Sequence, residues 1–471
     1  MRRASSRRLA IWGALPPYLG GKRRLCQLIF REIDRLLPRR EWRGLTFLDG
    51  FLGGGSVSLY AKAQGFRVVA TDIAERAITV GEVLIANSRV RLTREDVLRL
   101  AKDDGAAPGR IEVGYAPRVF TQEQARFLDR ALAIAGETTD PAKAALIRLL
   151  AIRVALLAHP MSQVRAGTIH RISSGEYEAI TESCMYHYVD GLRLTRPGKL
   201  WDLAQQLNVG VFHGEGEVIR ASVLDVLPEI RADIAYFDPP YPGVMSYEKE
   251  YRVIDEILEG ASRATSPFTA KGGAAMLDTL FERATHIPIW LLSLGNAVVG
   301  IEELEAKMAR FGRATKAIAI RYQHLPAVAT AEKKRENREF LIVGWDAEAP
   351  LLRRVSVQGV GAGAGLDHLN RAVDVEDDAG LGGTEAPAIC ARDGDALEDR
   401  KAPLGQQVAA IGGSAVAEAQ LGDDDPDALG VETGVDLDRE GQRLRASGHG
   451  DDVPLGRGGR SSLPRGGDGR G

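Results

Sequence analysis

The chain has 471 residues, of which 44% are hydrophobic, and this length allows two or three domains with at least one substantial core. Three widely spaced cysteines, Cys26, Cys184 and Cys390, exclude a disulfide-stapled scaffold and a paired-cysteine metal site, and they fit a reducing compartment. The formal net charge of -3 alone argues against a nucleic-acid partner, but the charges are unevenly distributed along the chain.

The N-terminal segment contains paired arginines, as an export signal does, but its apolar stretch is too short for one. That stretch, 9–15, is about seven residues long and runs into two prolines. The longest apolar segment of the chain, 144–158, is interrupted by two arginines and falls short of the roughly 18 unbroken apolar residues of a membrane helix. We therefore expect a cytoplasmic protein without a membrane partner.

Two short apolar segments, 45–49 and 66–72, are typical of buried strands. A glycine-dense turn and a helix-length segment, 56–64, separate them, which indicates a strand-loop-helix-strand unit. The turn, which includes Gly53 and Gly55, allows a ligand to approach the backbone at the N-terminus of a helix. Taken alone, it is as compatible with a plain strand-helix turn as with a cofactor site.

The acidic residues that end these two strands favour a particular cofactor. Asp72 follows the glycines by about twenty residues, the position from which a carboxylate accepts hydrogen bonds from ribose hydroxyls. Asp49 would repel a pyrophosphate but attract an ammonium group, and the consecutive glycines differ from the dinucleotide pattern. S-adenosylmethionine has both a ribose and an ammonium group, so we expect it as the cofactor.

The interval from Gly55 to Asp225 is longer than one or two α/β crossovers require, which predicts an inserted domain at residues 90–207. Its basic and aromatic residues together suit phosphate contacts and base reading, although each arginine taken singly is more typical of a solvated surface. These residues are Arg110, Arg118, Arg148, Arg153, Arg165, His170, Arg171, Tyr177, Tyr186, Tyr188, Arg193 and Arg196.

A third apolar segment, 233–237, leads into Asp238, Pro239, Pro240 and Tyr241. Two prolines stiffen the turn and remove amide donors, so that a carboxylate, a carbonyl and an aromatic ring are left to hold the exocyclic amino group of a flat base. These four residues are the candidate catalytic set. Tyr247 and Tyr251, farther along, either brace the base pocket or simply pack.

A further strand-like segment, 288–295, completes a pattern in which strands alternate with helices. The pattern predicts an α/β fold with a doubly wound, mostly parallel sheet, in which ligands bind at the carboxyl ends of the strands. The catalytic domain is expected to comprise residues 1–89 and 208–348, on either side of the insertion.

The C-terminal segment has a different composition. Residues 351–471 contain 24 of the 53 glycines, 13 basic and 22 acidic residues, and no Phe, Trp or Tyr. This composition predicts a low-complexity, disordered tail over 349–471. The remainder of the chain is therefore mildly basic, which suits a polyanionic partner.

Four stretches of the chain resemble, in the same order, the Dam-like D12 class of DNA adenine-N6 methyltransferases. They are PYLGGK at 17–22, FLDGFLGGGS at 47–56, VATDI at 69–73 and YFDPPY at 236–241. The resemblance implies a Rossmann-like class I methyltransferase sheet, S-adenosylmethionine as the donor, and a target adenine rotated out of double-stranded DNA. It also implies that the inserted, largely helical domain carries target recognition.

The resemblance also implies roles for individual residues. Tyr18 and Lys22 would lie near the methionine carboxylate of the donor, Gly53 and Gly55 would follow its backbone, and Asp72 would bind its ribose. Asp225 lies in a weaker fifth stretch, 222–227, that resembles the acidic strand end preceding the Asp-Pro-Pro-Tyr strand of the class, and it would bind the adenine amine of the donor.

Among the remaining motif positions, Asp238 would face both the donor and the target base. Residues Asp238 to Tyr241 would hold the target base. The class often has Glu-Pro-Phe where this chain has Asp49, Gly50 and Phe51, which indicates a looser turn beside the cofactor.

The sequence therefore predicts a site-specific DNA methyltransferase that modifies N6 of adenine and needs no metal. A companion restriction endonuclease is a candidate second partner. Two alternatives stay open at this point. One is a ribosomal-RNA guanine-N2 methyltransferase, a class that also displays Asp-Pro-Pro-Tyr after a strand, and the other is a catalytically silent, methylase-like nucleic-acid-binding protein.

Overall fold

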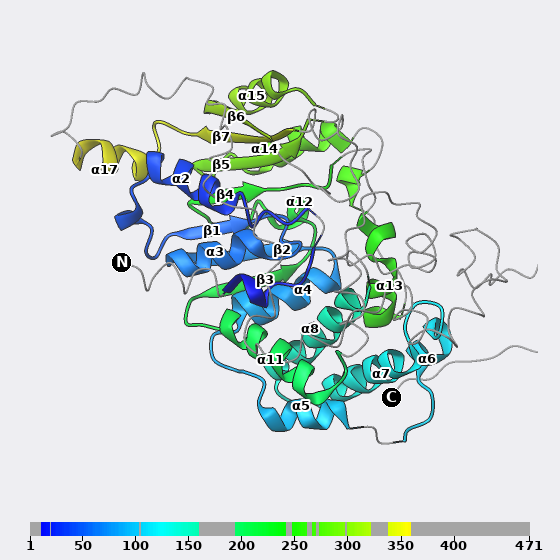
Figure 1. Cartoon of the computed structure of the whole chain (residues 1–471). Coiled ribbons are helices and arrows are strands. Elements are labelled where there is room, and N and C mark those ends of the chain that lie inside the picture. The colour runs from blue at the N-terminus through cyan, green and yellow to red at the C-terminus, as the bar shows by residue number, and fades with distance from the viewer. Residues whose placement is uncertain are drawn as a thin grey trace, which may run out of the picture. The chain divides into compact units, whose positions relative to one another are not determined.

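A single mixed sheet organises the part of the chain that the computed structural model describes, residues 11–18, 20–102, 105–159, 194–241, 247–260, 266–269, 273–296, 299–321 and 338–358. Within these residues the sheet has seven strands in the order β3-β2-β1-β4-β5-β7-β6 (Figure 1). The strands are β1 (Thr46–Asp49), β2 (Arg67–Asp72), β3 (Gly216–Arg220), β4 (Ile234–Phe237), β5 (Ile289–Gly295), β6 (Ala314–Arg321) and β7 (Arg338–Trp345).

Five neighbouring strands pair in parallel, β7 runs against them, and β6 at the edge runs in their direction again. β1 pairs with β2 on one side and β4 on the other, and β3 and β5 extend the parallel part. β7 is antiparallel to both β5 and β6. The predicted doubly wound, mostly parallel α/β sheet is confirmed, and because β7 is reversed, its first residues lie at the edge where the parallel strands end.

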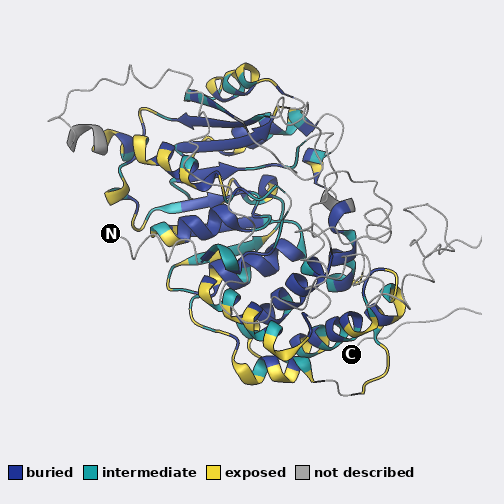
Figure 2. Cartoon of the chain, viewed as in Figure 1, coloured by how far each residue is buried: buried dark blue, intermediate teal, exposed yellow. Residues whose placement is uncertain are grey.

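Helices cover both faces of the sheet, so its central strands are buried on both sides (Figure 2). On one face, Phe47 of β1 contacts the rings of Phe30 and Phe66, in a cluster that includes residues of α2 (Cys26–Leu36) and α3 (Ser56–Gln64). On the other face, Leu48 belongs to an apolar core with residues of α12 (Val223–Val226), α14 (Met276–Arg283) and α15 (Ile301–Ala309). Each large side chain buried in this way contributes about 1.5–3 kcal/mol, which makes the sheet a rigid support for the loops at its edge.

Between β2 and β3 the described chain is helical. After α4 (Glu75–Gly81) and a π-helical turn (Glu82–Ala86) come α5 (Arg94–Ala101), α6 (Arg110–Tyr115), α7 (Gln122–Glu137), α8 (Pro141–Leu157) and α11 (Pro197–Gly210). Thr93 and Thr121 start α5 and α7 with capping boxes, and Asp140 caps α8 ahead of Pro141. The predicted helical insertion agrees with these helices, but its predicted end at residue 207 falls inside α11.

The other elements before β5 join these layers. They are the 3-10 turns at Trp12–Ala14, Arg39–Glu41, Pro267–Thr269 and Gly273–Ala275, and the helix α13 (Tyr247–Glu259), which follows the Asp238–Tyr241 turn. Among the helices that the structure describes, none combines the length and the apolar character needed to cross a bilayer.

The predicted disordered tail began too early in the sequence. Residues 350–358 form the helix α17 (Pro350–Gln358), with Pro350 at its first position and Leu352 buried. The prediction failed there because composition was averaged over more than a hundred residues, and this masked one short apolar turn. Residues 359–471 lie outside the described part of the chain.

Candidate active site

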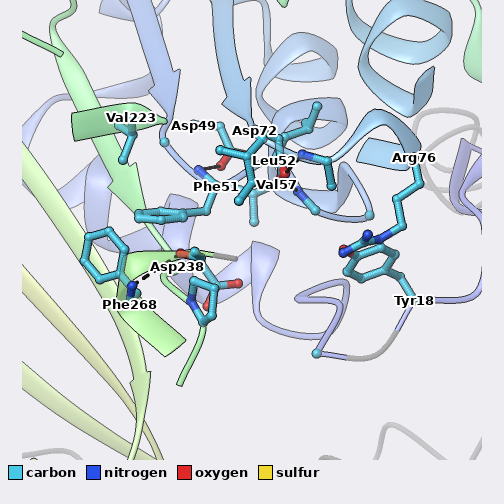
Figure 3. A pocket seen from close by; sticks show the side chains of 18 of the residues that line it. Tyr18, Asp49, Phe51, Leu52, Val57, Asp72, Arg76, Val223, Asp238 and Phe268 are labelled. Atoms are coloured by element: carbon cyan, nitrogen blue, oxygen red, sulfur yellow. Dashed lines mark hydrogen bonds between the residues drawn. The ribbon is translucent and has the colours of Figure 1, made fainter. Parts of the chain in front are cut away.

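A cavity opens at the carboxyl ends of β1, β2 and β4, where a doubly wound sheet is expected to bind its ligand (Figure 3). Its empty space is about 1170 Å³ when the part open to solvent is included. Five acidic and two basic side chains line it: Asp49, Asp72, Asp238, Asp255, Glu259, Lys22 and Arg76. This excess of carboxylates favours a ligand with positive charge.

The glycine-rich turn after β1 forms the floor of this cavity. Gly53 has a φ of +49°, and its N–H donates to Asp72 Oδ2 at 2.9 Å. Gly54 packs so closely on Tyr18 that a Cβ atom would lie 2.7 Å from the Tyr18 Cβ. The turn therefore has room for glycine alone where Tyr18 covers it.

Gly55 differs from its neighbours because it does not line the cavity. It precedes α3 with a φ of +76°, and a Cβ there would lie 2.8 Å from Val80 Cγ1. Its position lets α3 start close to α4, and its place along the backbone of the donor stays a prediction.

Asp72 is held in place by the backbone around it. Its Oδ2 accepts from Gly53 N, and its Oδ1 accepts from Ala74 N at 2.9 Å. Burial raises the pKa of Asp72 above its ordinary value, while these backbone donors oppose that rise. The carboxylate faces the cavity with a fixed orientation, as a group that recognises vicinal hydroxyls requires.

Asp49 is almost fully enclosed but still lines the cavity. Ser58 Oγ donates to its Oδ2 at 2.7 Å, and Phe51 N donates to its Oδ1 at 3.3 Å. Burial raises the pKa of Asp49 to about 7 in spite of these two donors. The side chain therefore changes charge near neutral pH, according to what occupies the cavity.

Two aromatic clusters form opposite walls of the cavity (Figure 3). Phe51 meets Phe268 edge to face with ring centroids 5.1 Å apart, which makes one wall apolar and suited to a flat ring. On the other side Tyr18 stacks on Tyr251 at 4.8 Å, and the guanidinium of Arg76 lies over the Tyr251 ring. Tyr251 of α13 thus packs against the cavity wall rather than facing a base directly.

Arg76, Asp255 and Phe268 line the cavity but were not identified from the sequence. Arg76 forms a buried ion pair with Asp255, which joins α4 to α13. Phe268 comes from the turn at Pro267–Thr269, far from any recognisable motif. The short spacing between Asp72 at the end of β2 and Arg76 in the first turn of α4 was the one available signal that both reach the same cavity.

Lys22 lines the cavity and points to Asp238. Its Nζ lies 2.8 Å from Asp238 Oδ1, 3.5 Å from Glu339 Oε1, and 3.1 Å from the carbonyl oxygen of Gly20. Burial alone would lower the pKa of Lys22, but the negative groups around it raise that pKa well above its ordinary value. Lys22 is therefore a permanent cation beside Asp238.

The turn after β4 presents its members unequally. Asp238 and Pro240 line the cavity, whereas Pro239 and Tyr241 do not. The Tyr241 hydroxyl donates to Glu339, at 2.6 Å from Oε1 and 2.7 Å from Oε2. Burial raises the pKa of Tyr241 well above its ordinary value, so this hydroxyl stays protonated.

Asp225 is placed differently from the prediction. It was expected at a strand end, but β3 ends at Arg220, and Asp225 lies exposed on the short helix α12. The residues that reach the cavity from this crossover are Ala221, Ser222 and Val223. The predicted strand end is wrong because an apolar-acidic run of four residues fits a helical turn as well as it fits a strand, while the contact of Asp225 with the donor stays a prediction.

The arginines predicted to contact DNA are only partly described. Arg148 pairs with Glu75, while Arg153 is buried, and burial lowers its pKa to about 9. Arg110 donates to two backbone carbonyls of α13, so it braces the insertion against the catalytic part. Arg165, His170, Arg171, Tyr177, Tyr186, Tyr188 and Arg193 lie outside the described residues, as does the side chain of Tyr247.

Among the described residues, no cluster of His, Cys, Asp or Glu side chains has the arrangement of a metal site. The sheet order, with a charged cavity at the strand ends and a glycine turn beneath it, defines a Rossmann-like methyltransferase fold.

Comparison with known proteins identifies the class of methyltransferase more closely. Residues 18–106 match the model of the D12 class N6 adenine-specific DNA methyltransferase family. The chain is also 27% identical over 345 residues to the type II methyltransferase M2.HphI of Haemophilus parahaemolyticus, an alignment that covers 69% of this chain and 96% of that protein.

Residues 18–106 thus have the signature of the D12 class, and together with the relative this match supports adenine-specific methylation of DNA as the activity. The matched region contains Lys22, Asp49, the glycine turn and Asp72, so it coincides with the first three motifs on which the resemblance was based. The match favours neither a guanine-N2 enzyme nor a silent binding protein.

Proposed function

We propose that the cavity binds S-adenosylmethionine and that Asp238 and the following turn hold the N6 amino group of an adenine extruded from double-stranded DNA. One observation supports this proposal above the others: the carboxylates that end three neighbouring strands, Asp49, Asp72 and Asp238, all line one cavity that is rich in negative charge. A ligand with a sulfonium and an ammonium group suits such a cavity.

The chemistry of the cavity fits the donor group by group. Asp72, already oriented by two backbone donors, is suited to bind the ribose hydroxyls. Asp49 is suited to pair with the ammonium group, and the Phe51 and Phe268 wall is suited to pack against the adenine ring of the donor. When bound, the donor supplies an activated methyl group on a positively charged sulfur.

The residues of the chain then have to orient and polarise the nucleophile. The N6 lone pair of adenine is delocalised into the ring, which makes it a poor nucleophile. Asp238 and a carbonyl of the proline turn that follows it would accept hydrogen bonds from the two N–H protons and so localise the lone pair on nitrogen. No covalent intermediate with the enzyme is needed, because the methyl group passes directly from sulfur to nitrogen.

We further propose that the inserted helical region, residues 90–207, contributes to target recognition. Between residues 141 and 175 it contains basic residues and no acidic ones. Arg110 joins its first helices to α13, which lies beside the cavity. Reaching the target atom in a duplex requires extrusion of the base, which costs a few kcal/mol, and contacts from such a domain would help to offset this.

A companion restriction endonuclease remains part of the proposal, since the relative from Haemophilus parahaemolyticus is a type II methyltransferase. If the two enzymes form a pair, DNA treated with this protein resists a nuclease from the same source. Continued cleavage of fully methylated DNA would contradict the pairing without affecting the methyltransferase activity.

The proposal is tested with purified protein and S-adenosylmethionine that carries a labelled methyl group. Unmethylated bacterial DNA, ribosomal RNA and a protein mixture are supplied as acceptors, and the products are digested to nucleosides. The label is expected in N6-methyladenine from DNA. Label found only in RNA or protein, or a failure of the protein to bind the donor, would reject the proposed function.

A further inference from the structure

A fully buried carboxylate lies behind the proposed base site, at the start of β7. Glu339 has no exposed surface and does not line the cavity, so it cannot contact a ligand there. It reaches this position because β7 runs antiparallel to β5 and pairs Glu339 with Gly295, the last residue of β5. The reversed strand thus delivers a side chain to the same edge as Asp238.

Gly295 leaves the space that brings Glu339 and Tyr241 together. A Cβ at position 295 would lie 2.9 Å from Tyr241 Cε2, closer than a side chain tolerates. The ring occupies that space, and its hydroxyl donates to both oxygens of Glu339. Tyr241 is therefore fixed at its hydroxyl and along its ring edge.

Lys22 links Glu339 to Asp238. Its Nζ is 2.8 Å from Asp238 and 3.5 Å from Glu339, and it also lies 5.3 Å from the centre of the Tyr241 ring. Two carboxylates thus share one ammonium group in a buried cluster. Burying a charge without compensation is strongly unfavourable, so a second carboxylate at this place calls for a specific explanation.

The charge of Lys22 supplies that explanation. An ammonium group paired with Asp238 alone would neutralise it and would disfavour the positive charge that develops on N6 during methyl transfer. A second carboxylate on the other side of the ammonium group restores a net negative charge to the cluster. It does so without exposing another acid to the ligand.

We propose that Glu339 is a positioning residue for methyl transfer, which fixes Tyr241 and offsets the charge of Lys22 so that Asp238 stays an effective acceptor. The proposal rests on the proposed function. In the reaction, the bond from N6 to the methyl carbon forms as the carbon-sulfur bond breaks, and sulfur keeps the electron pair. N6 then gives up one proton, for which the negatively charged cluster around Asp238 is the adjacent acceptor.

The proposal predicts a shift in pH dependence as well as a loss of rate. The ionisable groups around Asp238 are Lys22, Tyr236, Tyr241, Glu339 and Asp49. Replacing Glu339 by glutamine removes one negative charge, which makes every acid of this cluster release its proton more easily. The whole profile of kcat against pH therefore moves to lower pH.

The test compares kcat, the KM for S-adenosylmethionine and the pH profile in wild type, Glu339→Gln and Glu339→Asp, with unmethylated bacterial DNA as acceptor. We expect Glu339→Gln to lower kcat roughly 10–100-fold, as for groups that orient other active-site residues, with KM for the donor unchanged. Glu339→Asp keeps the charge, so its profile should stay at the pH of the wild type even if kcat falls.

Glu32 offers a matched control. It is a buried carboxylate that pairs with a strand lysine, Lys316 Nζ, at 2.9 Å, and it does not line the cavity. Glu32→Gln therefore reports what the loss of a buried ion pair does to folding alone, and we expect kcat and its pH profile to match those of the wild type.

The outcomes separate the two proposals. No DNA methylation by wild type and Glu32→Gln would reject the proposed function, whereas an active wild type with Glu339→Gln equal to it in kcat and pH profile would overturn only the role of Glu339. If Glu339→Gln does not fold, Tyr241→Phe replaces it, since this change removes the hydrogen bond to Glu339 and keeps the ring. A wild-type kcat for Tyr241→Phe would likewise overturn the role of Glu339 in fixing Tyr241.

Discussion

The two sides of the cavity are built in different ways. On the donor side, at the ends of β1 and β2, Asp72 is held by backbone N–H groups that lie within about twenty residues of it. On the base side, at the ends of β4 and β5, Asp238 depends on side chains from the N-terminal segment and from β7. The donor side is formed within one strand-loop-helix unit. The base side forms only when segments far apart in the sequence have come together in the sheet.

This difference predicts separable defects. Changes on the donor side should weaken donor binding and leave the rate at saturation near that of wild type. Changes on the base side should lower kcat and leave donor binding intact. Substitutions that mixed the two effects would break the distinction.

On the base side, we expect Asp238→Ala to abolish methyl transfer, by at least about 10²–10³-fold in kcat, because the main acceptor for the N6 amine is lost. Donor affinity, measured by calorimetry, should stay within a few-fold of wild type. Asp278→Ala is the control, since Asp278 of α14 pairs with Lys307 of α15 and does not line the cavity. Rapid turnover by Asp238→Ala would exclude this active site.

On the donor side, Asp72→Ala should raise the Kd for S-adenosylmethionine roughly 10–100-fold, or about 1.5–3 kcal/mol, as the ribose loses its charged acceptor. At saturating donor, kcat should change only a few-fold. Asp72→Asn keeps one acceptor oxygen, so its Kd for the donor should lie between those of the wild type and Asp72→Ala. A fall in kcat with an unchanged donor Kd would show that Asp72 acts on the base side of the cavity and would contradict its role in donor binding.

Gly295→Ala tests whether close packing on the base side matters by itself. The new Cβ would meet the Tyr241 ring at 2.9 Å, so the ring must shift and kcat should fall about tenfold at constant donor Kd. Gly136→Ala on α7 is the control for a glycine-to-alanine change, because nothing lies within 4 Å of a Cβ at that position. Equal activity of the two variants would show that the Tyr241 ring is free to move.

The pH dependence of donor binding gives the mildest test. Because the pKa of Asp49 is about 7, the side chain is protonated below that pH and must lose its proton to pair with an ammonium group. The donor Kd should therefore fall several-fold between pH 6 and pH 8, with proton release detected by calorimetry in two buffers. In Asp49→Asn this dependence should vanish.

The carboxyl group of Asp49 also affects the stability of the fold, which it lowers as the pH rises, whereas donor binding becomes tighter. Its folded-state pKa lies above its ordinary value, so Asp49 stabilises the unliganded fold at low pH, and this contribution is lost as pH rises towards about 7. Thermal melts of the wild type and Asp49→Asn across that range measure the difference. Parallel melting curves at every pH would contradict the raised pKa.

The donor side could be predicted from the sequence because its geometry is local. Asp49, the glycine turn and Asp72 follow from strand periodicity and from the rule that ligands bind at strand ends. The helix 56–64 was also predicted with the bounds that α3 has in the structure. Gly55 was the exception, since a glycine required for helix packing and one required for a ligand have the same sequence signal.

The base side was predicted only where the residue stands at the end of a parallel strand. Asp238 satisfies that condition. Glu339 does not, because it begins an antiparallel strand whose pairing with β5 is set by contacts far apart in the sequence. Lys22 was identified, but its pairing with Asp238 across 216 positions was not, since no local pattern encodes it.

The most direct test is made in a bacterial host that has no DNA methylation of its own. Wild type and Asp238→Ala are each expressed there, and the host DNA is sequenced for modified bases. We expect N6-methyladenine at a defined sequence context with the wild type and none with Asp238→Ala at equal levels of folded protein. Unmodified adenines in cells that contain folded wild-type protein, or the same modification with Asp238→Ala, would contradict this account of the site.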